Sequence, residues 1–285
     1  VQAWSQVTEA PLLVAERDGA DVLLQWQTVP NATGYNVYRT DDLASPFQLI
    51  GQTPGGSFRD GGAIAAPPDH YYYVVRGADA MGEGPSSDMA FRSHVELAPD
   101  GLGGYHQVVA VPFLYTLGGE PATAQAFCEA NPGLERIRRT IQPCGQHFYV
   151  ICGVPIFDFD MEAGEGYYVV AADPLTLVIV GSHDPDYRPG LGGSRVLLKS
   201  CPDCTGPTFN VVSLPYHAAA TTAEGLCQEL ATAGTPIAAI QAFLSQENRF
   251  VDHFCGSPIK DFPLVRGLAY GLLVSDDIEW QPEVW

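Results

Sequence analysis

Positive charge is the scarcest property of this 285-residue chain. Lys and Arg number 14 against 33 Asp and Glu, so the formal net charge is −19 at pH 7, and only Lys199 and Lys260 are lysines. A surface this acidic repels phosphate backbones and anionic headgroups. The composition therefore predicts that the chain has no nucleic-acid partner and no affinity for an anionic membrane surface.

Long apolar runs are also missing. No run approaches the roughly 18 residues that a helix needs to span a bilayer, and the longest, near 174–180, is short and rich in β-branched residues. We therefore expect no membrane insertion. The chain begins at Val1 and not at Met, as a secreted product does after its leader is removed, so we expect a mature secreted protein.

Charged residues of any kind are few, at 16% of the chain against about 25% in typical domains. Glycine and proline are abundant instead, with 30 and 23 copies, which favours turn-rich β structure over long helices. Seven cysteines in an acidic, lysine-poor chain indicate an oxidising compartment. The expected location is extracellular or at the cell surface.

Residues 11–91 read as short strands separated by turns, because apolar and polar residues alternate with period two and no helical period intervenes. Trp26, Tyr35, the Tyr71–Val75 run and the Gly82–Ser87 turn follow one another in the order and spacing of a fibronectin type III domain, which this segment resembles. The resemblance implies a seven-strand sandwich with Tyr71 as its corner tyrosine. It implies little about function, because this fold hosts many.

The remaining residues contain an internal repeat. Four blocks recur in the same order, at an offset of 103 residues in the strand blocks and 99 at a short helix that begins near Thr123 or Thr222. The matched blocks are 108–113 with 211–216, 123–128 with 222–227, 152–159 with 255–262, and Gly164 and Tyr167 with Gly267 and Tyr270. The pattern resembles a poorly characterised repeat of bacterial secreted and surface proteins.

These features predict a mainly β chain in three parts. A fibronectin type III-like sandwich with an N-terminal extension occupies residues 1–92, and two tandem β-rich modules, each with one short helix, occupy 93–190 and 191–285. We expect the two modules to share one fold.

The repeat also predicts disulfides. Cys128 and Cys152 occupy the places that Cys227 and Cys255 occupy in the second copy. Four cysteines allow three connectivities, and only pairing within each copy gives two equivalent units. The alternative is four buried free thiols in a cytosolic protein.

Three cysteines remain. Cys201 and Cys204 have redox-motif spacing, but a strand and not a helix is expected after them, so we favour a local disulfide over redox catalysis. A second hypothesis joins Cys144 and His147 to Cys201 and Cys204 as a tetrahedral zinc site. Without it, Cys144 is a free thiol or an intermolecular partner.

The sequence shows no metalloprotease spacing, nucleophile elbow, phosphate-binding loop or dinucleotide fingerprint. We therefore expect no enzyme and no cofactor. The hypothesis is an extracellular structural or adhesive protein of a bacterial surface or filament, whose main partner is its own copies. Tryptophans near the chain ends are the candidate self-association residues: Trp4, Trp280 and Trp285. A carbohydrate-binding accessory protein is the alternative, and a secreted enzyme with an unrecognised site comes third.

Overall fold

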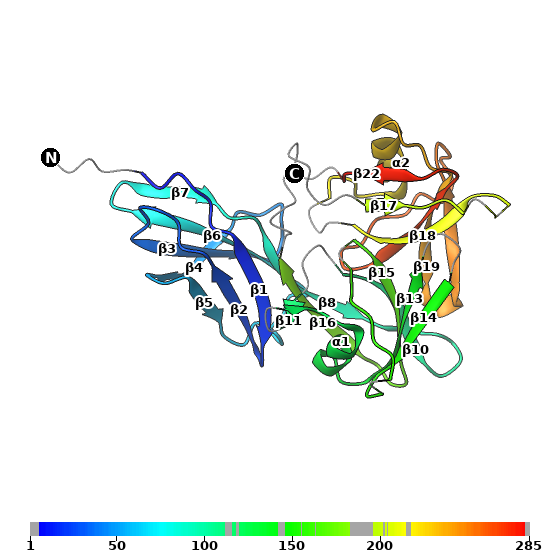
Figure 1. The fold of residues 1–285 in the computed structure, drawn as a ribbon, viewed down its shortest axis with the longest axis horizontal. Coiled ribbons are helices and arrows are strands. Elements are labelled where there is room, and N and C mark those ends of the chain that lie inside the picture. The colour runs from blue at the N-terminus through cyan, green and yellow to red at the C-terminus, as the bar shows by residue number, and fades with distance from the viewer. Residues whose placement is uncertain are drawn as a thin grey trace. The chain divides into compact units, whose positions relative to one another are not determined.

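The computed structural model describes residues 6–282 apart from 112–115, 118–119, 142–145, 155, 163, 183–195, 202, 204 and 215–217. This described part is mainly β, as predicted, with several antiparallel sheets and two α-helices. The chain divides into two compact units (Figure 1). No helix among the described residues has the length and apolar character needed to cross a membrane.

The first unit is a sandwich of two sheets. One sheet has the order β1-β2-β5, with β1 at Leu13–Asp18, β2 at Asp21–Trp26 and β5 at Ser57–Asp60. The other has the order β16-β8-β6-β3-β4, and β7 also pairs with β6. Its strands are β3 (Gly34–Thr40), β4 (Gln48–Thr53), β6 (His70–Asp79), β7 (Gly82–Ser86), β8 (Ala90–Glu96) and β16 (Thr176–Ser182).

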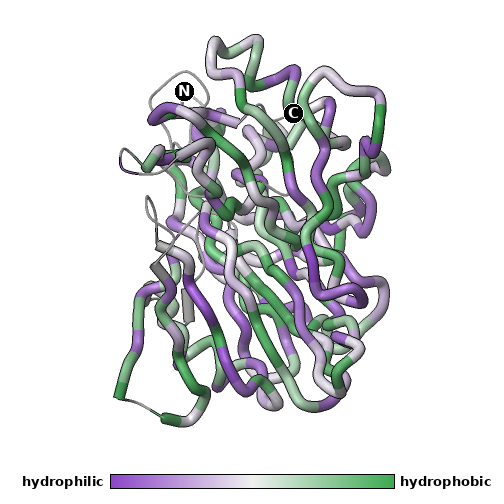
Figure 2. Tube along the Cα trace, turned by 90° about the vertical axis from the view of Figure 1, so that its right-hand side faces the viewer, coloured by the Kyte–Doolittle hydropathy of each residue, from purple (hydrophilic) through white to green (hydrophobic). Residues whose placement is uncertain are grey.

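Alternation along the strands builds the core of this sandwich. Val22, Leu24 and Trp26 are buried on one face of β2, and the Trp26 ring packs 5.4 Å from that of Tyr35. The Tyr71 hydroxyl donates a hydrogen bond to the carbonyl of Pro67 at 2.5 Å, as a corner tyrosine does. The fibronectin type III-like arrangement predicted for this segment is confirmed. Figure 2 shows hydrophobic and hydrophilic residues interspersed along the chain.

The second unit contains two sheets of matching order, β14-β13-β15-β10-β9 and β20-β19-β21-β18. The first module consists of β9 (Ala98–Pro99), β10 (Tyr105–Ala110), α1 (Ala124–Ala130), β13 (Leu134–Ile141), β14 (Gln146–Ile151) and β15 (Gly166–Ala171). The second consists of β17 (Val196–Leu198), β18 (Thr208–Ser213), α2 (Ala223–Thr232), β19 (Ala239–Leu244), the 3-10 helix Ser245–Glu247, β20 (Arg249–Phe254), β21 (Ala269–Val274) and β22 (Ile278–Trp280). Short strands β11 (Thr116–Leu117) and β12 (Glu120–Pro121) pair with each other.

The two modules agree in detail as well as in order. The hydroxyls of Thr123 and Thr222 cap α1 and α2, so both helices begin where the sequence predicts. The ring of Tyr167 stacks on Phe159 at 5.9 Å, and that of Tyr270 stacks on Phe262 at 6.2 Å. Tandem modules with one short helix each are therefore present.

Strands β8 and β16 correspond in the repeat to β17 and β22. β17 pairs with β22 in the second module, and the positions 103 residues earlier lie in β8 and β16, which pair with each other in the sandwich sheet. The boundary expected at residue 92 therefore falls inside β8. Of the first repeat copy, residues 93–94, 114–120 and 178–185 belong to the compact unit of the sandwich, and the rest of both copies belongs to the other unit.

Within the second unit, the modules contact each other reciprocally. The backbone N–H of Ala110 donates to the carbonyl of Gly267 at 2.9 Å, and Ser213, 103 residues after Ala110, donates to Gly164 at 2.8 Å. The β-bridges Val109–Leu268 and Val212–Glu165 are related by the same offset. The modules are thus joined about a local pseudo-two-fold axis, as two subunits are in an isologous dimer.

Candidate functional site

A disulfide ties each module's helix to the end of an edge strand. Cys128 in α1 pairs with Cys152 after β14, and Cys227 in α2 pairs with Cys255 after β20. The Cα atoms are 5.5 Å apart in both bonds. These are the pairings that the repeat predicts.

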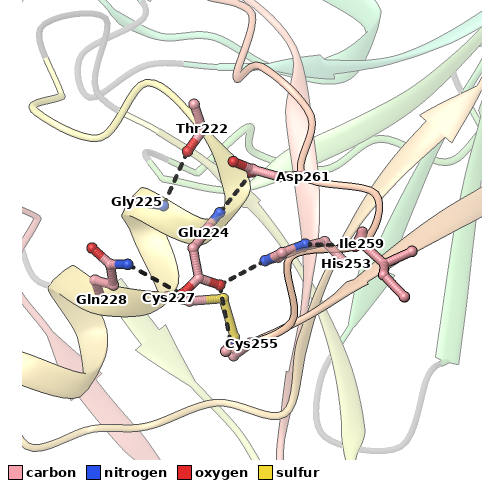
Figure 3. The surroundings of a disulfide bond; sticks show 10 residues. Thr222, Glu224, Gly225, Cys227, Gln228, His253, Cys255, Ile259 and Asp261 are labelled. Carbon is pink, nitrogen blue, oxygen red and sulfur yellow. Dashed lines mark hydrogen bonds and ion pairs between the residues drawn. A yellow bond between two sulfur atoms is a disulfide. The ribbon is translucent and has the colours of Figure 1, made fainter.

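The second disulfide adjoins a buried histidine and a carboxylate (Figure 3). The Nε2 atom of His253, on β20, lies 2.9 Å from a carboxylate oxygen of Glu224, in the first turn of α2. The same oxygen accepts a hydrogen bond from the backbone of Gly256, and Gln228 donates to the other. His253 is completely buried, and its Nδ1 atom lies 3.3 Å from the carbonyl of Ile259.

The pKa of Glu224 is lowered, mainly by the hydrogen bond with His253 and then by those from Gly256 and Gln228. Both ring nitrogens of His253 face oxygen atoms, one a carbonyl and one a carboxylate. An ionised carboxylate only accepts hydrogen bonds, so the Nε2 atom of His253 is the donor to Glu224. The pair thus links α2 to β20 by a charge-assisted hydrogen bond.

Glu224, Cys227 and His253 bring three possible metal-ligand atoms within 4.8 Å of one another. The sulfur of Cys227, however, is bonded to Cys255. Zinc and similar ions bind the cysteine thiolate, which a disulfide sulfur no longer offers. These residues therefore do not fit a metal ion.

The first module fills the same place with neutral groups. Gln125 stands where Glu224 stands, and its side-chain oxygen accepts a hydrogen bond from Gly153, the counterpart of Gly256. Its amide nitrogen donates to the carbonyls of Ile151 and Val154. The counterpart of His253 is the buried Val150. The shared role of this position is to brace the turn after the edge strand, and the hydrogen-bonded Glu224–His253 pair is a feature of the second module alone.

Sequence reasoning missed the Glu224–His253 pair, although the repeat contained a signal for it. Aligning the copies at their offsets places Glu224 over Gln125 and His253 over Val150, two changes that give one copy a carboxylate and an imidazole in place of two neutral side chains. Asp158 and Asp261, whose recurrence the repeat shows, accept hydrogen bonds from the backbone of Gln125 and Glu224 at the helix starts.

The remaining cysteine hypotheses are only partly within the described residues. Cys201 is buried and disulfide-bonded, whereas Cys204 and Cys144 lie outside the described residues. The pairing of Cys201 with Cys204 therefore stays a prediction. The oxidised state of Cys201 removes one thiolate from the hypothetical zinc site. His147, its imidazole member, is exposed and contacts the Thr140 hydroxyl at 3.3 Å.

The self-association hypothesis is wrong for Trp280. This residue is only 2% exposed and packs in the core of the second module, where its indole nitrogen lies 3.2 Å from Glu229. Its strand, β22, pairs with β17 and so brings the ring into the module's own interior. Trp4 and Trp285 lie outside the described residues.

One face of the first module's sheet carries arginine and aromatic side chains, a group that sequence reasoning did not single out. Arg136 and Arg138 alternate on β13 and so lie on one face. Arg138 is registered opposite Tyr149 on β14 and Tyr168 on β15. We call Arg136, Arg138, His147 and Tyr149 the arginine face.

Of the comparisons with known proteins, only the one with solved structures gives a match. No protein-family model and no curated protein matches the chain. A Fn3-like protein from Clostridium thermocellum is 29% identical over 30% of this chain and 92% of its own, with a TM-score of 0.27. The 6th fibronectin type III domain of human fibronectin type III domain containing protein 3 is 21% identical over 32% of this chain and 85% of its own, with a TM-score of 0.24.

Three fibronectin domains in a row give a broader but weaker likeness. The FN1–FN3 domains of chicken CNTN1 are 12% identical over 62% of this chain and 68% of their own, with a TM-score of 0.28. The neighbours of this chain among solved structures are thus fibronectin type III domains, and they match it over only part of its length.

Proposed function

We propose that this chain is a non-catalytic extracellular structural or adhesive protein of a bacterial surface or extracellular assembly. The observation that carries the proposal is the duplicated module, braced by one disulfide in each copy and joined by reciprocal backbone hydrogen bonds. Duplication of a compact module adds length and surface without adding an active site. Disulfides persist in oxidising compartments, which supports a place outside the cell.

The proposed partner is another copy of the chain. β14 and β20 are edge strands of their sheets, and an edge strand can pair with a strand from another molecule. Large apolar side chains are exposed on β14 and the turn after it, which marks an interaction surface. They are Phe148, Ile151, Val154, Ile156 and Phe157.

Charge opposes this association, because each copy carries a net charge of −19. Assembly must rely on apolar burial at short range while the like charges repel at longer range. Salt shortens the range of that repulsion to about 8 Å at physiological ionic strength. We therefore expect self-association to strengthen as salt is added.

Light scattering and electron microscopy of the full chain at rising concentration test the proposal. Substituting Phe157→Asp, or truncating residues 1–5 and 283–285, which include Trp4 and Trp285, is expected to weaken assembly while the modules stay folded. Leu102→Asp is the matched control, since Leu102 is also a highly exposed apolar residue, at 84% against 73% for Phe157, but lies outside β14 and the turn after it. A chain that stays monomeric at every concentration, in low and high salt and with or without calcium, contradicts self-assembly.

A further inference from the structure

The arginine face is unusual in so acidic a chain, because its arginines have no acidic partner among the residues that the structure describes. Neither Arg136 nor Arg138 forms an ion pair with any described residue, whereas Arg39, Arg59, Arg76, Arg139 and Arg249 all do. The Nε atom of Arg138 is buried and has no hydrogen-bond partner in the described part of the chain. A buried donor without an acceptor is costly to maintain. An anion bound at this face would instead neutralise the guanidinium charges that no described acidic side chain neutralises.

Aromatic rings hold the two guanidinium groups in place. Arg138 lies 4.4 Å from the centre of the Tyr168 ring, and Arg136 lies 5.9 Å from that of Tyr149. Such contacts orient an arginine without neutralising its charge. Tyr149 is 47% exposed, so its ring is available as an apolar platform at the edge of the sheet.

Neutral hydrogen-bonding groups lie beside the charged ones. Burial and the nearby Arg138 lower the pKa of His147, which is therefore a neutral imidazole at pH 7. A neutral imidazole has one donor and one acceptor, and the Thr140 hydroxyl lies 3.3 Å from its Nδ1 atom. The face thus offers cationic, aromatic and neutral polar groups together.

The second module shows that its fold does not need this group. The equivalents of Arg136, Arg138, His147 and Tyr149 are Ala239, Gln241, Phe250 and Asp252. Gln241 and Asp252 form a hydrogen bond with each other across β19 and β20. The arginine face is therefore specific to the first module.

We propose that the arginine face binds a sugar acid, with Arg136 and Arg138 on the carboxylate and the Tyr149 ring against the sugar. Guanidinium groups pair with carboxylates through parallel hydrogen bonds, and an aromatic ring buries the apolar C–H face of a pyranose. His147 and Thr140 supply partners for its hydroxyls. The net charge of −19 repels polyanions, so the ligand carries few carboxylates. This site does not depend on self-association.

Binding of small probes to the full chain by calorimetry and NMR tests the site. Galacturonic acid is expected to bind measurably tighter than galactose, which lacks the carboxylate, and than acetate, which lacks the ring. The assignment is overturned if acetate or galactose binds with the same affinity as galacturonic acid. It is also overturned if neither galacturonic acid nor its short oligomers bind at millimolar concentration.

Variants separate the site from general charge effects. Arg138→Gln introduces the residue found at the equivalent position of the second module. It is expected to weaken the binding of galacturonic acid about tenfold or more, because a charge-assisted hydrogen bond is lost. Arg249→Gln removes the same charge from β20 and is expected to leave binding unchanged. Circular dichroism checks that both variants fold. If both variants lose the same affinity for galacturonic acid, the arginine face is not a sugar site. The same follows if Arg138→Gln changes only self-association.

Discussion

At the scale of single residues, Asp277 is held by three donors from the segment after β17. Its carboxylate accepts hydrogen bonds from the backbone N–H of Ser200 at 2.8 Å, the Ser200 hydroxyl at 2.9 Å and the Lys199 ammonium at 3.1 Å. These bonds lower the pKa of Asp277 from 3.8 to about 2, and the bond from the Ser200 backbone contributes most. The ionised carboxylate is therefore favoured in the folded chain.

This shift predicts a pH dependence. A carboxylate with a depressed pKa in the folded state stabilises fully above its unfolded pKa, and the contribution is lost as pH falls through the folded value. The window for Asp277 therefore runs from about pH 4 to about pH 2. Asp277→Asn is expected to be less stable than the wild type at neutral pH and to approach it on acidification. Urea unfolding across this range measures the difference, and a difference that does not change with pH contradicts the assignment.

At the scale of elements, each module's short helix is fixed to its edge strand at two points. One is the disulfide, and the other is the polar brace of Glu224 or Gln125 on the following turn. A helix of only 7 or 10 residues is marginal by itself in water, so its stability comes from such tertiary contacts. The two modules meet this need with different chemistry at the brace.

The first module thus provides a template for substitutions in the second. Glu224→Gln leaves His253 buried without a charged partner, and His253→Val removes a donor from Glu224. Each is expected to lower the free energy of unfolding by about 1–3 kcal/mol. The double variant reproduces the Gln125 and Val150 pair and is expected to lose less than the sum of the two.

A double-mutant cycle by urea unfolding measures this coupling. Additive losses would show that Glu224 and His253 act independently. The same cycle at Gln228 and Glu224, which contact each other at 3.2 Å on the helix surface, is the control and is expected to show weaker coupling.

At the scale of the whole molecule, the stability of the second unit depends on the close packing of its two modules against each other. Gly166 lies at their contact, where a β-carbon on it would be 2.3 Å from the β-carbon of Ala269 and 2.6 Å from a methyl group of Val211. Gly166 and Ala269 are equivalent positions, 103 residues apart. Because the two positions meet near the pseudo-two-fold axis, one of them must lack a side chain.

Gly166→Val is therefore expected to force the modules apart and to lower the free energy of unfolding by about 1–3 kcal/mol, the usual cost of overpacking. Gly61→Val is the control, since a β-carbon there meets nothing within 4 Å. Chemical denaturation of both variants measures the effect. Equal losses in the two variants would rule out a specific role for the contact between the modules.

Patterns local in the chain made much of the fold predictable. Period-two alternation predicted the strands of the sandwich, and the recurrence of Thr123 as Thr222 predicted where both helices begin. The repeat predicted both disulfide pairings. Trp280 was misassigned because a large ring near a chain end looks the same in sequence whether it is free or packed.

The sequence by itself determined the β character, the duplication and the cysteine pairing, because each follows from residues that are near in the chain or equivalent in the repeat. Only the tertiary structure decided that the modules face each other about a pseudo-two-fold axis and that β8 and β16 complete the sandwich sheet. It also gathered the arginine face from separate strands. Strand register and sheet contact depend on which distant surfaces bury one another, and alternation within one strand carries no information about its partner.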